Sequence, residues 1–270
     1  MRNARTRYIG FDMDDCVGHV HFLYPLANEF IKDHAFIRKA AAVLAACERR
    51  RETGFFRPCI AEVMCAVYDA IRSRKIHGAF LFSNNSNQHT VEFVGLVMEA
   101  MVQQERELSK TPHLFEMAIS FHSPERQVAT EGETGVKDWA AITNSLHHHR
   151  LPLPTSHSDL LFFDDKKHVL TGEIPHYTVV PAYHSRASLA DAIGPIEPHV
   201  PASLRDRWNK LNGHGAVRHF VPTEDEGGRT AFLGAIQRFL GVPAGKSGKS
   251  GKSRRTGRKT RRRTRKNRRL

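Results

Sequence analysis

The chain has 270 residues, 40% of them hydrophobic, a length that suits one domain or one domain with an insertion. No apolar run reaches the roughly 18 residues of a membrane-spanning helix, and the basic N-terminus lacks the apolar region of a secretory signal. Four scattered cysteines are too few for a disulfide framework. We therefore expect an intracellular, non-secreted protein with reduced thiols and no membrane partner.

The net charge of +13 comes from the C-terminal end of the chain. Residues 244–270 contain 14 of the 41 lysines and arginines and no acidic residue, so 27 basic side chains face 28 acidic ones elsewhere. Residues 1–242 are therefore predicted to form a nearly neutral domain. Residues 243–270, with few apolar side chains, are predicted to be a disordered basic tail.

Short apolar segments alternate with helix-like periodicity along the domain. The expected strands are residues 8–11, 79–82, 115–121, 160–163 and 177–181. The expected helices lie within 19–57, after Pro58, and at about 90–107, 137–146, 203–211 and 230–240. Residues 48–54 are interpreted as a frayed helix end. This alternation predicts an α/β fold, a doubly wound parallel sheet with helices on its faces.

Carboxylate and hydroxyl side chains, which can bind a ligand or take part in catalysis, follow three of the predicted strands. They are Asp12, Asp14, Ser83, Asp164 and Asp165. Because ligands of open α/β sheets bind at the carboxyl ends of the strands, we expect these side chains to share one edge. The sequence therefore predicts a single site assembled from segments far apart in the chain.

The spacing of Asp12 and Asp14 has three interpretations. Two crowded carboxylates repel unless a cation or a shared proton relieves them, so the pair is a metal site, an acid and nucleophile, or an accident. Taken alone, Ser83 could instead cap the following helix. The acidic pair at 164–165 could be a turn, and Lys137 could be a solvated surface lysine.

The order of these segments resembles the haloacid-dehalogenase (HAD) superfamily, chiefly its phosphatases, over about residues 8–182. The first motif of that family, Asp-x-Asp-x-Thr/Val after an apolar run, is matched by Asp12-Met13-Asp14-Asp15-Cys16-Val17, where Cys16 takes the usual Thr or Val position. The second motif, an apolar strand ending in Ser or Thr, is matched by Leu81-Phe82-Ser83-Asn84.

The two remaining motifs are an acidic pair and a single lysine. An apolar strand ending in two acidic residues is matched by Phe162-Phe163-Asp164-Asp165. The third motif is a single lysine, for which Lys137 is our choice, with Lys166 and Lys167 as rivals that directly follow the acidic pair.

The resemblance implies a role for each residue. Asp12 would be the nucleophile that accepts the phosphoryl group, and Asp14 would be the general acid and base. Ser83 and the Asn84 backbone N–H would hold phosphate oxygens, and Lys137 would offset charge in the transition state.

The resemblance also implies a metal ion. Mg²⁺ would be held by the Asp12 carboxylate, the Asp14 backbone carbonyl and a carboxylate from Asp164 or Asp165. The implied activity is Mg²⁺-dependent hydrolysis of a phosphomonoester through an aspartyl-phosphate. A retained Asp14 favours phosphoryl transfer over dehalogenation.

Two features bear on the partners. Residues 19–57 leave room for a small helical cap or flap, and a lightly capped site suits a large substrate such as a phosphoprotein or a nucleic-acid end. The basic tail, residues 244–270, could bind nucleic acid or another polyanion, direct nuclear import, or serve solubility or assembly.

The alternative function is a catalytically silent HAD-like scaffold that binds nucleic acid or a structural partner through this tail. No oligomeric state is predicted.

Overall fold

The computed structural model of the chain describes residues 6–127, 137–185, 187–211 and 225–241. The predicted basic tail, residues 243–270, lies outside the described residues, and so do residues 128–136 before Lys137. Within the described ranges, every helix is too short or too polar to cross a membrane. All four cysteines are buried free thiols, as expected.

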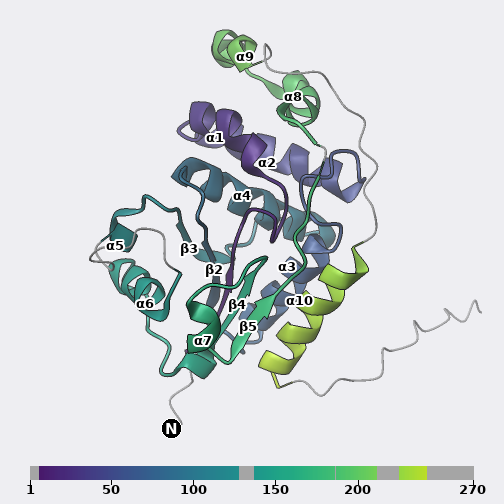
Figure 1. Ribbon diagram of the computed structural model, residues 1–270. Helices are drawn as coiled ribbons and strands as arrows, with labels where there is room; N and C mark the ends of the chain where they lie inside the picture. Colours follow the sequence, from purple (N-terminus) through teal and green to yellow (C-terminus); the bar gives the residue numbers. More distant parts are fainter. Residues whose placement is uncertain (1–5, 128–136, 186, 212–224, 242–270) are drawn as a thin grey trace, which may run out of the picture.

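A five-stranded sheet forms the centre of the molecule (Figure 1), and every pair of neighbouring strands is parallel. This confirms the predicted parallel α/β class. The strands are β1 (Tyr8–Phe11), β2 (Gly78–Phe82), β3 (Phe115–Ile119), β4 (Leu160–Asp164) and β5 (His176–Val179). Only β1 has the expected bounds at both ends: β2 and β5 begin one residue earlier, β4 ends one residue later, and β3 and β5 each end two residues earlier.

The strand order is β3-β2-β1-β4-β5, so the chain moves outward from β1 in one direction and then in the other. The reversal lies between β1 and β4, which pair with Phe11 opposite Phe163. The Asp12 N–H continues the pairing by donating to the Phe163 carbonyl at 2.8 Å. Such a reversal opens a crevice at the carboxyl ends of the two strands, where ligands of these sheets bind.

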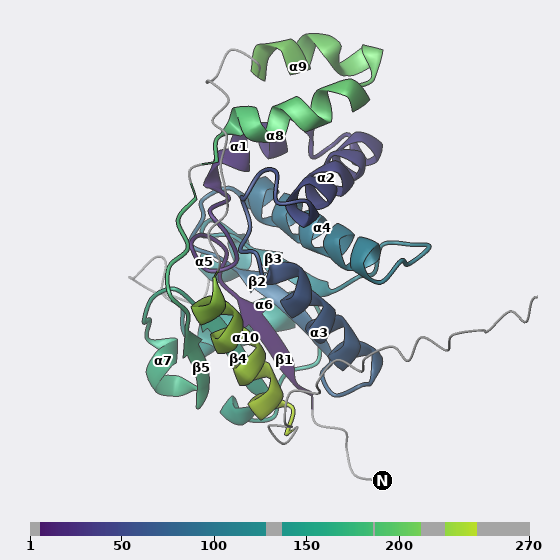
Figure 2. The same cartoon turned by 90° about the vertical axis from the view of Figure 1, so that its right-hand side faces the viewer.

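Helices cover both faces of the sheet (Figures 1 and 2). Alternate strand residues point to opposite faces, so Phe11 packs in one hydrophobic cluster while Phe80 and Phe162 pack in the other. One face is covered by α3 (Ile60–Arg72), α4 (Gln88–Glu105) and α10 (Glu226–Phe239), and the other by α6 (Trp139–His148) and α7 (Leu170–Glu173). A Cβ at Gly10 would lie 2.5 Å from each of the two rings, so only glycine fits there.

The segment 19–57 contains two helices, α1 (Tyr24–Phe30) and α2 (His34–Arg49). Both pack against α4, and α2 also packs against α8 (Leu189–Ile196), a helix that the sequence pattern did not predict. The Trp208 indole of α9 (Arg205–Leu211) packs on Phe30. Figure 2 shows α1, α2, α8 and α9 grouped at one end of the molecule. Short 3-10 helices occur at His21–Leu23, His157–Asp159, Glu197–His199 and Ala202–Leu204, and α5 is Pro124–Gln127.

The two ends of this segment are tied together immediately after the first motif. The His19 N–H donates to the Phe55 carbonyl at 2.7 Å, and the Arg57 N–H donates to the Val17 carbonyl at 3.1 Å. A Cβ at Gly18 would lie 2.4 Å from the Phe55 oxygen, so this close backbone approach requires glycine. The segment therefore leaves and rejoins the domain at one point beside the first motif.

The segment 48–54 was expected to be a frayed helix end, but in the structure the Glu48 carboxylate holds it in place. Glu48 lies in the last turn of α2, and its carboxylate accepts hydrogen bonds from the Thr53 hydroxyl and from the Phe55 N–H at 2.9 Å. Burial raises the pKa of the Glu48 carboxyl to about 7, although these hydrogen bonds lower it. Glu48 therefore fixes the loop that closes the segment.

We expect Glu48→Gln to remove part of the pH dependence of folding stability. The folded protein retains the Glu48 proton up to a pKa of about 7, whereas the unfolded chain releases it near 4.5. The unfolded chain thus binds fewer protons between these values, and stability falls as pH rises through this window, by roughly 1–3 kcal/mol. Urea unfolding of both proteins across the window measures the difference.

Glu52→Gln provides the control. Glu52 is 49% exposed, pairs with Arg50, and has a pKa lowered below 4.5 by that hydrogen bond, so it stays ionised throughout the window. Its substitution should leave the slope unchanged. A Glu48→Gln protein with the wild-type slope would contradict the assignment.

Candidate functional site

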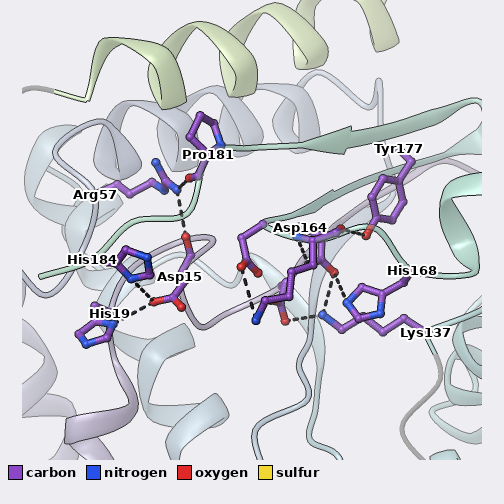
Figure 3. Close-up of polar contacts among 12 residues, drawn as sticks. Asp15, His19, Arg57, Lys137, Asp164, His168, Tyr177, Pro181 and His184 are labelled. Carbon is purple, nitrogen blue, oxygen red and sulfur yellow. Dashed lines mark hydrogen bonds and ion pairs between the residues drawn. The ribbon is translucent and has the colours of Figure 1, made fainter.

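A buried lysine lies at the centre of the carboxyl edge of the sheet. Lys137 Nζ is 2.6 Å from Asp12 Oδ1 and 2.8 Å from Asp164 Oδ2, and it joins the residue after β1 to the last residue of β4. The three side chains are 1%, 8% and 0% exposed, respectively. Figure 3 shows Lys137 reaching toward Asp164. The sequence-based choice of Lys137 thus falls on a residue that contacts both acidic motifs.

Local sequence explains how Lys137 reaches this position. The predicted helix 137–146 begins later, at Trp139, because the Asp138 side chain caps it by accepting from the Ala141 N–H at 2.7 Å. Lys137 therefore precedes the helix. The rival Lys166 is 70% exposed and lies 3.6 Å from Asp165, and Lys167 is also exposed.

The buried charges shift one another's proton affinities. Burial raises the pKa of Asp12 to about 7, although the Lys137 ammonium opposes this. Burial alone would lower the pKa of Lys137, but the neighbouring Asp12 and Asp164 carboxylates outweigh it and raise the pKa. The lysine therefore stays cationic in the buried site.

A third carboxylate, that of Asp165, completes an acidic cluster. Oxygen atoms of Asp12, Asp164 and Asp165 all lie within 4.8 Å of one another. Burial raises the pKa of Asp165. Within the described ranges, two ammonium groups contact the cluster, those of the buried Lys137 and the exposed Lys166, so three ionised carboxylates would leave a negative excess that a divalent cation could neutralise. All-oxygen ligands suit a hard ion such as Mg²⁺.

Asp14, two residues after Asp12, is oriented by Asn85, which donates from Nδ2 to Asp14 Oδ2 at 3.0 Å. The other carboxylate oxygen, Oδ1, is buried and has no hydrogen-bond partner in the part of the chain that the structure describes. Burial raises the pKa of Asp14, which favours its protonated form. Asp14 is thus held by Asn85 through one oxygen, in surroundings that favour its neutral carboxyl form.

The loop after β2 places Ser83 at the same edge. The Ser83 hydroxyl accepts from the Asn85 N–H at 3.0 Å, and no acceptor for its own proton lies among the residues that the structure describes, so that proton can be donated to a ligand. The helix-cap alternative for Ser83 is wrong, because Asn87 caps α4 by accepting from the Thr90 N–H at 2.8 Å. Asn84 is exposed beside Ser83.

Arg126 of α5 supports this loop and was not identified from the sequence. Its guanidinium donates to the Ser83 carbonyl at 2.7 Å and to Asn84 Oδ1 at 2.5 Å, and it lies over the Phe82 ring. The side chain is buried, and burial lowers the pKa of Arg126 to about 10. The arginine fixes the backbone that follows β2.

A second buried arginine, Arg57, supports the turn after β1. It donates to the backbone carbonyls of Asp15, Cys16 and Pro181 and pairs with Asp225 at 2.6 Å. Figure 3 shows this guanidinium between the Asp15 turn and Pro181. The turn that carries Asp12 and Asp14 is therefore held by segments from three other parts of the chain.

His168 is a further residue beside the acidic cluster. Its Nε2 lies 3.5 Å from Asp164 Oδ2, and burial lowers the pKa of its imidazole (Figure 3). In sequence it follows the acidic pair by only a few residues, and no pattern distinguished it from the other histidines.

The structure brings the predicted residues to one edge, with Lys137, Asp12 and Asp164 in contact and Asp165 within the cluster. Asn85, Arg126 and Arg57 were missed. Comparison of the chain with protein-family models, with curated proteins and with solved structures finds no match.

Proposed function

We propose that this protein is a HAD-type phosphatase that hydrolyses a phosphomonoester through an aspartyl-phosphate on Asp12. The observation that supports this most strongly is the buried Lys137, whose ammonium contacts both Asp12 and Asp164. Motifs separated by more than a hundred residues thus meet at the reversal point of the sheet. A doubly wound HAD-like architecture is part of the same proposal.

The chemistry follows in two steps. An Asp12 carboxylate oxygen attacks the phosphorus, the bond from phosphorus to the leaving oxygen breaks, and Asp14 gives its proton to that oxygen. A water molecule then attacks the aspartyl-phosphate while Asp14 takes up the water proton. The bond from phosphorus to Asp12 breaks, which releases inorganic phosphate and restores both carboxyl groups to their starting states.

The remaining residues bind and orient the phosphate. The Ser83 hydroxyl and the Asn84 N–H would donate to its oxygens, and the Lys137 ammonium would stabilise the charge on the transferring group. Arg126 keeps the Ser83–Asn84 backbone in place. Asn85 fixes one oxygen of Asp14, and the other has no hydrogen-bond partner among the described residues.

The acidic cluster fits a resident Mg²⁺ ion. Asp12, Asp164 and Asp165 would hold it, together with the Asp14 backbone carbonyl. When bound, the ion supplies positive charge that lets an anionic phosphate approach an anionic carboxylate.

A phosphorylated protein or nucleic-acid end is the substrate class that we propose. The basic segment 244–270 would add sequence-independent attraction to such a polyanion.

Release of p-nitrophenol from p-nitrophenyl phosphate tests the activity. We expect turnover with Mg²⁺, its loss in EDTA, and its return when Mg²⁺ is added in excess. Phosphoserine peptide and a 5′-phosphorylated oligonucleotide, assayed by phosphate release, test the substrate class. A folded protein that hydrolyses none of the three with Mg²⁺ would overturn the proposal and favour the silent scaffold.

A further inference from the structure

Three side chains outside the proposed catalytic set converge on the other side of the first motif. His19 Nδ1 lies 2.9 Å from Asp15 Oδ1, and His184 Nδ1 lies 3.5 Å from the same oxygen. Figure 3 shows both imidazoles directed at the Asp15 carboxylate. The three potential ligand atoms all lie within 4.8 Å of one another.

The backbone holds this arrangement from both sides. Asp15 has φ +59°, an uncommon conformation for a residue with a side chain, and its carbonyl accepts from Arg57 Nη2 at 3.0 Å. The same carbonyl accepts from the Tyr183 N–H at 2.8 Å, and the Tyr183 hydroxyl donates to the Gly54 carbonyl at 3.1 Å. Asp15 and the residue preceding His184 are therefore fixed to each other independently of the imidazoles.

The distances match the spacing of ligands around one small metal ion. Zinc lies about 2.0–2.2 Å from nitrogen and oxygen ligands, so two ligands of a tetrahedral site are separated by about 3.4 Å. The two observed separations from Asp15 Oδ1 fall on either side of this value. A simple ion pair needs only one imidazole, whereas here a second one arrives from a distant segment and presents Nδ1 to the same oxygen.

We propose that Asp15, His19 and His184 form a binding site for a borderline divalent metal of the zinc class. Two imidazoles and one carboxylate leave a coordination position for water or a ligand, and imidazole favours Zn²⁺ over Mg²⁺. The site would join the turn after β1 to the segment after β5. This inference does not rest on the proposed phosphatase activity.

Another histidine–carboxylate pair supplies a matched comparison. His113 Nδ1 lies 3.6 Å from Glu99 Oε1, and His113 is 72% exposed, close to the 70% of His184. The described residues place no second imidazole with that pair to complete a three-ligand cluster. The two exposed histidines therefore differ mainly in whether a further imidazole shares their carboxylate.

Isothermal titration with Zn²⁺ tests the site in the full chain after metal removal, with excess Mg²⁺ present to occupy the all-oxygen cluster. We expect one tight Zn²⁺ site per chain in the wild type, and a loss of affinity of at least about tenfold in His184→Ala. His113→Ala should bind as the wild type does. Because His184 is exposed, its truncation should leave the fold intact, and circular dichroism checks this.

Cobalt provides a second measurement, since the visible absorption of bound Co²⁺ reports nitrogen ligation at low coordination number. This band should appear in the wild type and in His113→Ala and be lost in His184→Ala and His19→Ala. The chain has 17 histidines, so weak adventitious binding is expected elsewhere. A wild type without a tight site, or a His184→Ala isotherm that overlays the wild type, overturns the proposal.

Discussion

Asp12→Asn is expected to lower phosphomonoester turnover at least about a thousandfold. The amide has nearly the shape of the carboxylate, and its oxygen can still accept from Lys137, so the fold should persist. An amide is nevertheless a poor nucleophile toward phosphorus. The measurement is kcat for p-nitrophenyl phosphate with Mg²⁺, together with a thermal melt to confirm folding.

Asp14→Asn is the matched comparison, because it removes a carboxylate from the same turn but with a different assigned role. The p-nitrophenolate group leaves without needing a proton, whereas a serine oxygen does need one. Asp14→Asn should therefore lose more activity on a phosphoserine peptide than on p-nitrophenyl phosphate, and Asp12→Asn should lose both alike. Retention of turnover within tenfold of wild type by Asp12→Asn would exclude Asp12 as the nucleophile.

Lys137→Met is expected to reduce the free energy of unfolding by about 3–5 kcal/mol in the absence of added metal. The lysine is 1% exposed, and its removal leaves the Asp12 and Asp164 carboxylates buried without their common cation. Methionine fills similar volume, so the lost charge rather than a cavity dominates the effect. Urea unfolding at neutral pH measures it. The loss should be smaller in acid, where Asp12 is protonated.

Lys166→Met serves as the control for Lys137→Met. Lys166 also faces a carboxylate of the acidic pair, at 3.6 Å, but it is 70% exposed. Ion pairs that water reaches contribute about 0–1 kcal/mol, so this substitution should change stability little. Equal effects of the two substitutions would contradict the prediction, because they would show that removing Lys137 does not leave buried carboxylates without a cation.

The parallel sheet was predictable because its strands are short apolar runs that end in polar residues. Residues 8–11 match β1 at both ends, and the acidic and serine motifs mark where β4 and β2 finish. Parallel strands share a carboxyl edge, so this local pattern was sufficient to place Asp12 and Asp164 at the same edge of the sheet. The strand order came only from the structure, because an apolar run does not show which other strands it pairs with.

The supporting residues could not be predicted, for a physical reason. Arg126 and Arg57 act through contacts with backbone carbonyls far away in sequence, and any residue can supply a carbonyl. The helix α8 was missed because Pro195 interrupts its short periodic pattern. His184 is far from Asp15 in the sequence and belongs to no recognisable motif, so only the folded structure shows that the two side chains meet.

The Arg57–Asp225 pair determines how far the chain can be shortened. Asp225 caps the start of α10, and that helix packs on β4 and β5. A gene truncated after codon 241 would retain both partners, whereas a stop codon ahead of Asp225 would leave the Arg57 charge buried without its carboxylate. Although Asp225 lies more than 200 residues after the first motif, nonsense mutations upstream of it would therefore weaken the turn that carries Asp12 and Asp14.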